Sequence, residues 1–444
     1  MLLLALLYNF VTTIIKLEIG MADLTTLLNM LRNNVPHLRT LKQIAIDRDS
    51  ICIGNNAVVA RCCGEELGGE VKMKCYYRPH RNLAKLYGKS YYPREVGLYT
   101  LMGHIDYLDA VITPWVEGQP LDRALHDPDA DYLSLSRAFD AMARDTLAQA
   151  MAHGDIKPDN IIVRDDSSMQ LIDWDAAWRP DIDHIEEWGT VGFRHPLRRS
   201  SDFNKHIDDY PIALIATMLA ALAAEPEYFA PHLNDDGSMF SPESLLRGKD
   251  ALLDHAIGLF AERGDVAHYR IAKSLYTQHM MIPRLADYLR YSYVALPKAI
   301  PEGCTAEYYE GMWGCHLNGV WIVPPLYDEL TVIDDHTCQL RLDEQRISLK
   351  MCGKIDFDTD IPADLEHRMR RLEALRASER KLVLPHAMKS TLGGAPRRWS
   401  ADEDERLVMM YSDNRSVRYI AYMLQRSEAA IRRHLSTLHL PRKK

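Results

Sequence analysis

The residues with the clearest chemical potential lie in the segment His153–Asn160 and a short distance after it. Transfer of a γ-phosphoryl group needs a carboxylate that orients the attacking hydroxyl, a carboxylate and an amide that hold Mg²⁺, and a cation that balances the developing charge. The sequence supplies these groups, in that order, in Asp155, Asp173, Asn160 and Lys157. The spacing therefore predicts phosphoryl transfer that depends on ATP and Mg²⁺.

This pattern resembles the catalytic loop of serine/threonine protein kinases, H-R-D-x-K-x-x-x-N, and Asp173-Trp174-Asp175 stands at that family's D-F-G. The resemblance covers roughly Leu41 to Val294 and implies a bilobal α+β fold, with a small lobe at 41–118 and a large lobe at 119–298. It also implies that Asp155 orients the substrate hydroxyl, that Lys157 stabilises the transferred charge, and that Asn160 and Asp173 hold Mg²⁺. A surface turn rich in Asp and Asn is the plainer alternative for this segment.

A nucleotide site of this kind needs strands that place backbone N–H groups and a lysine side chain beside the phosphates. Residues 51–60 predict a strand, a tight turn and a second strand, with Gly54 allowing the backbone to approach phosphate. The match is weak because the other glycines of G-x-G-x-x-G are absent. Residues 71–76 alternate as a half-buried strand, in which Lys74 takes the position of the family's ATP lysine. Lys72 lies on the same face, and the sequence does not separate the two.

Two further residues complete the predicted ATP site. Glu95 is expected on the next helix as the partner of the ATP lysine, with an ordinary surface glutamate as the alternative. The segment 111–121 resembles the last small-lobe strand and the hinge. Val116 offers both a backbone donor and a backbone acceptor, which makes it the best hinge contact for adenine.

Downstream, the segment Gly189–Pro196 resembles the G-T-x-x-Y-x-A-P that shapes the family's peptide-substrate platform. The resemblance implies that Thr190 and Lys157 bracket Asp155, as in serine/threonine kinases. The glutamate expected after Pro196 is replaced by Leu197. Asp208 resembles the aspartate that ties down the catalytic loop, and a simple helix cap is the equal alternative.

Departures from the family pattern keep other functions open. Gly154 replaces the arginine that normally receives an activating phosphate, so we expect an enzyme that is not gated by such phosphorylation. Trp174 and Asp175 resemble aminoglycoside- and choline-type phosphotransferases, which favours a small-molecule acceptor as the alternative. A second alternative is a non-catalytic pseudokinase scaffold that binds DNA. Lys157 and the Thr190 segment favour a protein acceptor.

Composition sets the remaining boundaries. The chain has 444 residues, 47% of them hydrophobic, which suits several domains with real cores, and its net charge of -9 argues little about partners. Its eight cysteines lack metal-ligand spacing, so we expect reduced thiols in a cytoplasmic protein. Residues 1–40 comprise an apolar leader and a helix from Leu24 to Leu41. The leader lacks a basic start and a cleavage site and is short for a membrane span, so we expect no membrane anchor and regard Met21 as an alternative start.

After the kinase-like region, residues 299–355 change to short strands. Trp313-Gly314 and the residues that follow resemble one WG-type β-repeat. Because a single repeat cannot bury its own apolar face, it is expected to pack on a neighbouring domain, on a partner or on a degenerate copy of itself, as a small β-module without a ligand. Residues 356–395 are charged and rich in Leu and Arg, which predicts a helical linker.

The last segment, 396–444, opens with Trp399-Ser400 and acidic residues that resemble the start of Myb/SANT-like domains. Two more helical stretches follow, in helix-turn-helix order, and basic residues outnumber acidic ones. This resemblance implies a three-helix domain that contacts DNA, with docking to a protein as the alternative. The residues expected to contact nucleic acid are Arg426, Ser427, Arg432 and Arg433, together with His434.

Overall fold

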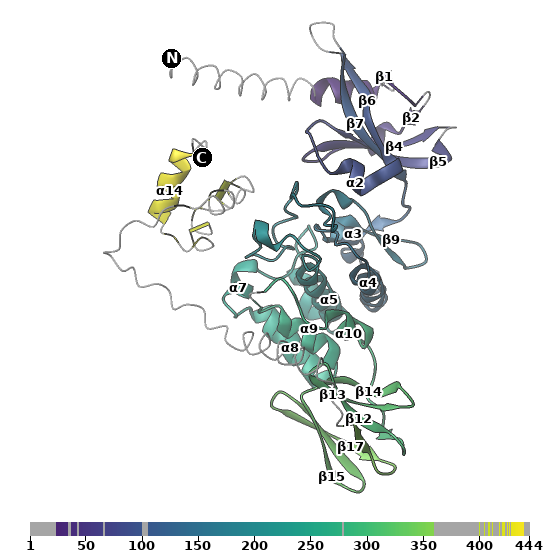
Figure 1. The fold of residues 1–444 in the computed structure, drawn as a ribbon, viewed down its shortest axis with the longest axis vertical. Helices are drawn as coiled ribbons and strands as arrows, with labels where there is room; N and C mark the ends of the chain where they lie inside the picture. Colours follow the sequence, from purple (N-terminus) through teal and green to yellow (C-terminus); the bar gives the residue numbers. More distant parts are fainter. Residues whose placement is uncertain are drawn as a thin grey trace. The chain divides into compact units, whose positions relative to one another are not determined.

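The computed structural model describes residues 24–358, except 34–36, 42–43, 65–66, 100–104 and 278, and a discontinuous set of residues between Trp399 and Leu438. The chain forms two compact units, Met1–Glu117 and Gly118–Lys444. Helices and sheets occur in both, which confirms the mixed α+β class predicted from the sequence (Figure 1). Among the described residues, no single helix is long and apolar enough to cross a membrane.

A seven-stranded sheet in the order β1-β6-β7-β5-β4-β2, with β3 beside β4, forms the first unit. Its strands are β1 (His37–Leu38), β2 (Ala45–Ile46), β3 (Cys52–Ile53), β4 (Ala57–Gly64), β5 (Gly69–Tyr76), β6 (Tyr91–Tyr99) and β7 (Ile105–Pro114). Alternation in β5 places Met73 and Cys75 in one core with Leu27 and Leu31 of the helical residues 24–32. Tyr76 contributes to a second small cluster on the other face. The strand predicted at 71–76 is thereby confirmed.

Two helix predictions in this unit were wrong. The first helix ends at residue 32, not at Leu41, and His37–Leu38 forms β1. Pro36 explains this early end, because proline cannot continue a helix beyond its first turn. Glu95 lies on strand β6, because the aromatic and aliphatic residues of 91–99 pair with β7 around an irregularity near Arg94, which has φ +51°. Between β5 and β6 the α-helix is the short α2 (Leu83–Tyr87).

Helices packed around α5 dominate the second unit. α5 (Asp209–Ala224) is buried along almost its whole length, as its continuous apolar sequence predicts. It packs in one hydrophobic core with the other long helices, and a small sheet of β10-β9-β8 lies at the edge of this core. The elements are β8 (Gln119–Pro120), α3 (Leu121–Leu125), α4 (Tyr132–Leu147), β9 (Ile161–Val163), β10 (Met169–Leu171), α6 (Pro226–Phe229), α7 (Pro242–Leu246), α8 (Ala251–Arg263), α9 (Val266–Ser274) and α10 (Leu285–Arg290).

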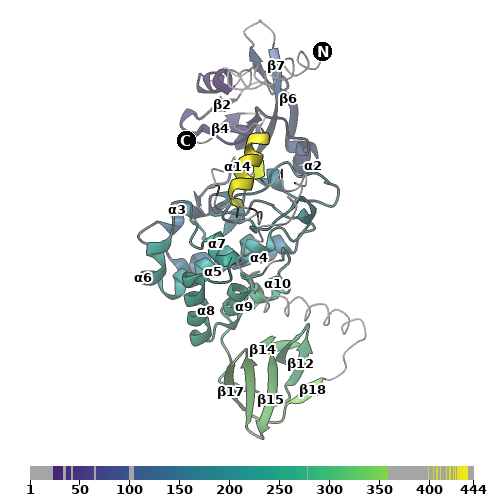
Figure 2. The same cartoon turned by 90° about the vertical axis from the view of Figure 1, so that its left-hand side faces the viewer.

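The β-module belongs to the same unit and consists of two four-stranded sheets, in the orders β11-β17-β16-β15 and β14-β13-β12-β18. Figures 1 and 2 both show these sheets beside α8, α9 and α10. The strands are β11 (Ala299–Ile300), β12 (Thr305–Tyr309), β13 (Met312–Leu317), β14 (Val320–Tyr327), β15 (Glu329–Asp334), β16 (Thr337–Leu342), β17 (Gln345–Met351) and β18 (Asp356–Asp358). Strand β18 begins inside the segment that the sequence assigned to a helical linker.

The β-module shares its core with the helices. Its buried residues Leu326 and Tyr327 belong to the same hydrophobic cluster as Ile271 of α9. Arg270 lies 3.0 Å from the Asp328 carboxylate, and Arg284 donates to the carbonyl of Pro325 at 2.9 Å. The β-module therefore packs on the helices of the same unit.

Near the end of the chain, α14 (Glu428–Thr437) contributes to a separate cluster of buried side chains. The described residues in this cluster include Leu407, Tyr411, Ile420, Leu424, Ile431 and Leu435. Trp399 is partly buried against it.

Candidate functional site

The β9–β10 hairpin brings two of the predicted metal ligands together. Asn160 comes directly before β9, and Asp173 comes two residues after β10. Ile161 pairs with Leu171, and the register continues outward because the Ile172 N–H donates to the Asn160 carbonyl at 3.0 Å. Asp173 then leaves the hairpin with a left-handed backbone, at φ +66°. Two residues that are thirteen positions apart are thus adjacent at one end of a hairpin.

Asp155 lies at the centre of the candidate site. Its Oδ1 accepts the Thr190 N–H at 2.5 Å, and its Oδ2 accepts from the Asn160 amide at 3.1 Å. The Lys157 ammonium is 3.9 Å from the same Oδ2. The structure therefore brings together four of the residues predicted from the sequence, and both oxygens of Asp155 are held in fixed directions.

Lys157 carries its charge among several carboxylates. Its Nζ lies 3.0 Å from Asp159, closer than to Asp155. Burial disfavours the ammonium form, but the carboxylates of Asp155, Asp159 and Asp173 together outweigh burial and raise the pKa of Lys157 above its ordinary value. Lys157 is therefore a cation at neutral pH, beside the Asp155 carboxylate.

A glycine before Asp155 is required by the backbone. Gly154 has φ +82°, and a Cβ there would lie 2.1 Å from the Ala176 carbonyl. A residue with a side chain would clash with the Ala176 backbone at this position and would be strained. Asp208 holds the loop, because its carboxylate accepts hydrogen bonds from the His153 N–H at 2.5 Å and the Gly154 N–H at 2.8 Å.

Of the two alternatives for Asp208, a residue that holds the 153–155 loop or a simple helix cap, the hydrogen bonds match the first. It occupies the N-cap position of α5, but its side chain makes no capping hydrogen bond. The carboxylate is almost completely buried, and burial raises its pKa even though the neighbouring His153 and the two N–H donors favour the charged form. Its function in the fold is to hold the loop that carries Asp155.

The four residues predicted for the ATP site, which are Gly54, Lys74, Glu95 and Val116, all lie in the first unit. Lys74 is 7% exposed, whereas Lys72 is half-buried, so burial separates the two lysines that the sequence could not. Gly54 closes the β3–β4 turn by donating to the Ala57 carbonyl at 2.9 Å. No described residue hydrogen-bonds the backbone of Val116.

Glu95 is engaged differently from its predicted role. Its Oε1 accepts the backbone N–H of Thr40 at 2.9 Å and that of Leu41 at 2.8 Å, and its Oε2 accepts the Thr40 hydroxyl at 2.5 Å. The side chain is 1% exposed. These contacts give Glu95 a structural role at the start of the sheet, where it fixes the segment before β2.

Replacement of Glu95 by alanine is therefore expected to destabilise the first unit by about 3 kcal/mol, because the buried N–H of Leu41 and the part-buried N–H of Thr40 lose a charged acceptor. Urea unfolding measures this loss, and binding of a fluorescent ATP analogue at a temperature where the variant is folded tests the alternative role. The matched control is Glu117→Ala, since that glutamate is exposed and pairs with Arg61 at 2.8 Å. Normal stability with weakened nucleotide binding in Glu95→Ala would contradict this assignment.

In the C-terminal segment, the predicted DNA contacts lie in different environments. Arg432 and Arg433 are exposed on α14. The Arg426 guanidinium lies 4.0 Å from the centre of the Trp399 ring, and the His434 ring stacks on Trp399 at 3.7 Å. Arg426 and His434 thus contribute to the packing around Trp399. Ser427 lies outside the described residues.

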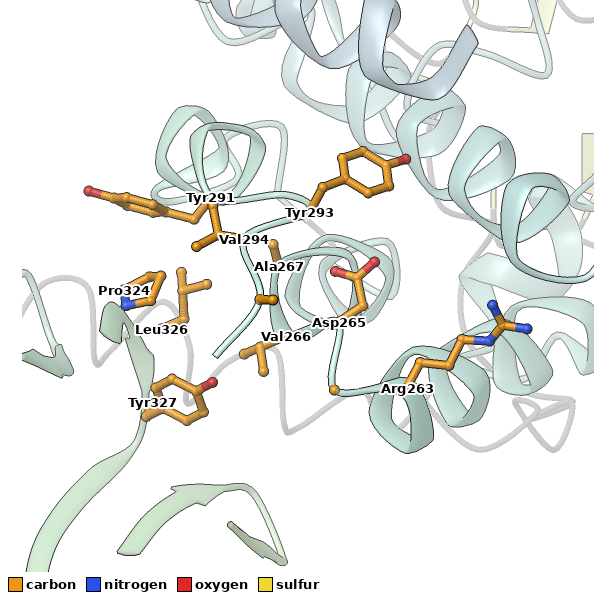
Figure 3. Close-up of a pocket in the computed structure, with 12 residues that line it drawn as sticks. Arg263, Asp265, Val266, Ala267, Tyr291, Tyr293, Val294, Pro324, Leu326 and Tyr327 are labelled. Atoms are coloured by element: carbon orange, nitrogen blue, oxygen red, sulfur yellow. The ribbon is translucent and has the colours of Figure 1, made fainter. Parts of the chain in front are cut away.

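A cavity of about 160 Å³ lies elsewhere in the second unit, between the α8–α9 turn and β14 (Figure 3). Asp265, Tyr291, Tyr293 and Tyr327 are among its lining residues, and none of the residues predicted for phosphoryl transfer is. The described residues also contain no group of three or more His, Cys, Asp or Glu side chains placed to hold a metal. Asn160 and Asp173, the two ligands predicted from the sequence, would suffice only for Mg²⁺ bound together with phosphates and water.

Arg198 contacts the backbone of the candidate site, and sequence reasoning did not identify it. It is 3% exposed, and its Nη1 donates to the carbonyls of Gly154 and Trp188. In the sequence it forms a pair with Arg199, which gives no sign that only one of the two is buried. The sequence as a whole matches no protein-family model and no curated protein at a significant level.

Proposed function

We propose that this protein is an ATP-dependent serine/threonine protein kinase. The observation that carries the proposal is the environment of Asp155, whose two oxygens are oriented by Thr190 and Asn160 and whose neighbouring cation is Lys157. A carboxylate held in this way suits the orientation of an attacking hydroxyl. The bilobal kinase-like arrangement implied by the sequence is part of the same proposal.

The residues present fit Mg²⁺ bound with ATP. The Asn160 Nδ2 donates to the carbonyl and carboxylate of Asp155, and its amide oxygen receives no hydrogen bond from a described residue. Asn160 and Asp173 would thus supply hard oxygen ligands, which Mg²⁺ prefers. The bound ion would neutralise charge on the β- and γ-phosphates, and Lys74 would hold the α- and β-phosphates.

A protein acceptor is favoured by the position of Thr190. Its backbone N–H contacts the Asp155 carboxylate, so the 189–196 segment is held beside the residue that would orient the acceptor. Arg194 donates to the Gly189 carbonyl at 2.6 Å and holds this segment in a turn. An ordered segment at this place can form one side of a site for an extended peptide.

The test is incubation of the full chain with γ-labelled ATP, Mg²⁺ and a mixture of protein substrates, followed by mapping of the labelled residues. We expect label on serine or threonine that disappears in Asp173→Ala. The matched control is Asp183→Ala, an exposed aspartate in the following segment, which is expected to retain activity. Turnover only with small hydroxyl compounds would replace the proposal by a small-molecule phosphotransferase, and absence of ATP binding would reject both.

A further inference from the structure

Arg198 connects two backbone segments that meet at Asp155. Through Nη1 it donates to the Gly154 carbonyl at 3.2 Å, directly before Asp155, and to the Trp188 carbonyl at 3.0 Å. The second segment continues to Thr190, whose N–H holds Asp155 Oδ1. One guanidinium nitrogen thus bridges the loop that carries the carboxylate and the segment that orients it.

The packing at Gly189 shows how closely these groups converge. A Cβ at this residue would lie 2.5 Å from the Gly154 carbonyl oxygen, and 3.4 Å from both Arg198 Nη1 and Asp155 Oδ1. Gly189 also has φ +73°, where a side chain would be strained. A side chain at Gly189 would therefore disturb the contact between Arg198 and the Gly154 carbonyl.

The base of Arg198 is itself rigid. The backbone N–H of Arg198 donates to the His195 carbonyl at 3.0 Å, and the backbone N–H of Leu197 donates to His195 Nδ1 at 3.1 Å. The opposite ring nitrogen of His195 donates to the Thr277 carbonyl at 3.2 Å. Burial lowers the pKa of His195 to about 4, so the neutral ring can accept and donate in this manner at pH 7.

The charge of Arg198 is retained at some cost. Its Nε and Nη2 are buried and have no hydrogen-bond partner among the described residues. Burial lowers its pKa to about 10, and the nearby Arg194 acts in the same direction, whereas Asp208 and Asp155 favour the charged form. A buried guanidinium with two nitrogens that make no hydrogen bond lowers the stability of the fold. This loss indicates that the arginine has a role at the site.

We propose that Arg198 is the positioning residue of this site: it clamps the Gly154 and Trp188–Thr190 backbones and so fixes the direction of the Asp155 carboxylate. The inference rests on the proposed kinase function for its catalytic consequence. The clamp is built from backbone contacts within the chain, so it holds Asp155 without a phosphate on the 173–198 segment.

The test compares Arg198→Met with Arg199→Met, which removes the same charge from the adjacent exposed residue. Hydrogen exchange followed by mass spectrometry should show faster exchange in peptides covering 153–156 and 188–191 for Arg198→Met alone. In steady-state assays we expect kcat to fall about 100-fold, as for a small displacement of a catalytic group, while the KM for ATP changes little. In Arg198→Ala, millimolar guanidinium should restore part of kcat, whereas ammonium should not.

Arg198→Lys keeps the buried charge and replaces Arg198→Met in these measurements if the methionine variant does not fold. We expect it to lower kcat about 10-fold, because lysine lacks the planar guanidinium with its fixed N–H directions. Unchanged exchange at both segments in a folded variant would overturn the clamp. Unchanged kcat with altered exchange would overturn its catalytic role. If the wild-type chain transfers no phosphate, the kinase proposal fails, and the exchange comparison still decides whether the clamp exists.

Discussion

Asparagine in place of Asp155 is expected to lower the rate of phosphoryl transfer about 10³-fold, within the range for loss of a positioned acid–base group. Asparagine has the same shape, and its Oδ1 can still accept the Thr190 N–H. An amide NH₂ group replaces Oδ2, and this group can neither accept a hydrogen bond from Asn160 nor pair with Lys157. In the wild type these two side chains lie 3.1 Å and 3.9 Å from Oδ2. We therefore expect kcat to fall while the KM for ATP and the unfolding temperature change little.

The matched control is Asp159→Asn. Asp159 lies in the same loop and also pairs with Lys157, at 3.0 Å, but its side chain is 51% exposed. It is expected to alter kcat less than about 10-fold, since it orients no acceptor. If Asp159→Asn caused the larger loss, the carboxylate closer to Lys157 would be the catalytic one, and the assignment of Asp155 would be wrong.

The largest expected effect on stability comes from His268, away from the candidate site. Its ring is completely buried, with Nδ1 2.7 Å from the Asp265 carboxylate and Nε2 3.3 Å from that of Asp140. Asp140 is itself 3% exposed. Glutamine at 268 would leave a buried carboxylate without a cation, so we expect the free energy of unfolding to fall by about 3–5 kcal/mol.

This contribution depends on pH in a defined direction. Burial opposes protonation of His268, but Asp265 and Asp140 outweigh it and raise the pKa from 6.5 to about 10. A raised pKa stabilises the folded state fully below pH 6.5, and the contribution is lost as the pH rises toward 10. The difference in stability between wild type and His268→Gln should therefore shrink across this interval.

Urea unfolding of both proteins at several pH values measures this difference. His255→Gln is the control, because His255 pairs with Glu225 at 2.8 Å on the surface, where both side chains are more than a third exposed. Exposed pairs contribute little, so this variant should remain close to wild type. A gap between wild type and His268→Gln that stays constant from neutral to alkaline pH would show that the ring is not held as a cation.

The part of the candidate site carried by local sequence was the most predictable. The relation between Asn160 and Asp173 follows from a short hairpin, in which strand pairing determines which residues meet. The sequence showed only that Gly154 stands in place of an arginine, and the structure adds that its backbone has φ +82°, which favours glycine. The mixed α+β class was implied by the resemblance of the 153–175 motifs to protein kinases.

Two contacts between distant residues were missed by sequence reasoning. Glu95 was expected on a helix, but its carboxylate binds Thr40 and Leu41, more than fifty positions earlier. Arg198 contacts the carbonyl of Gly154, 44 positions away. Spacing along the chain contains no information on these approaches, because they depend on how whole elements pack.

The shared core of the helices and the β-module has a consequence for the evolution of this chain. A recombination event that removed residues 299–358 would expose the apolar side chains around Ile271 and leave Arg270 and Arg284 without Asp328 and the Pro325 carbonyl. A lineage could therefore not exchange this module as freely as a domain on a linker. Selection for a folded protein should keep the repeat and the helical unit together, so substitutions at Arg270 and Asp328 should be inherited as a pair.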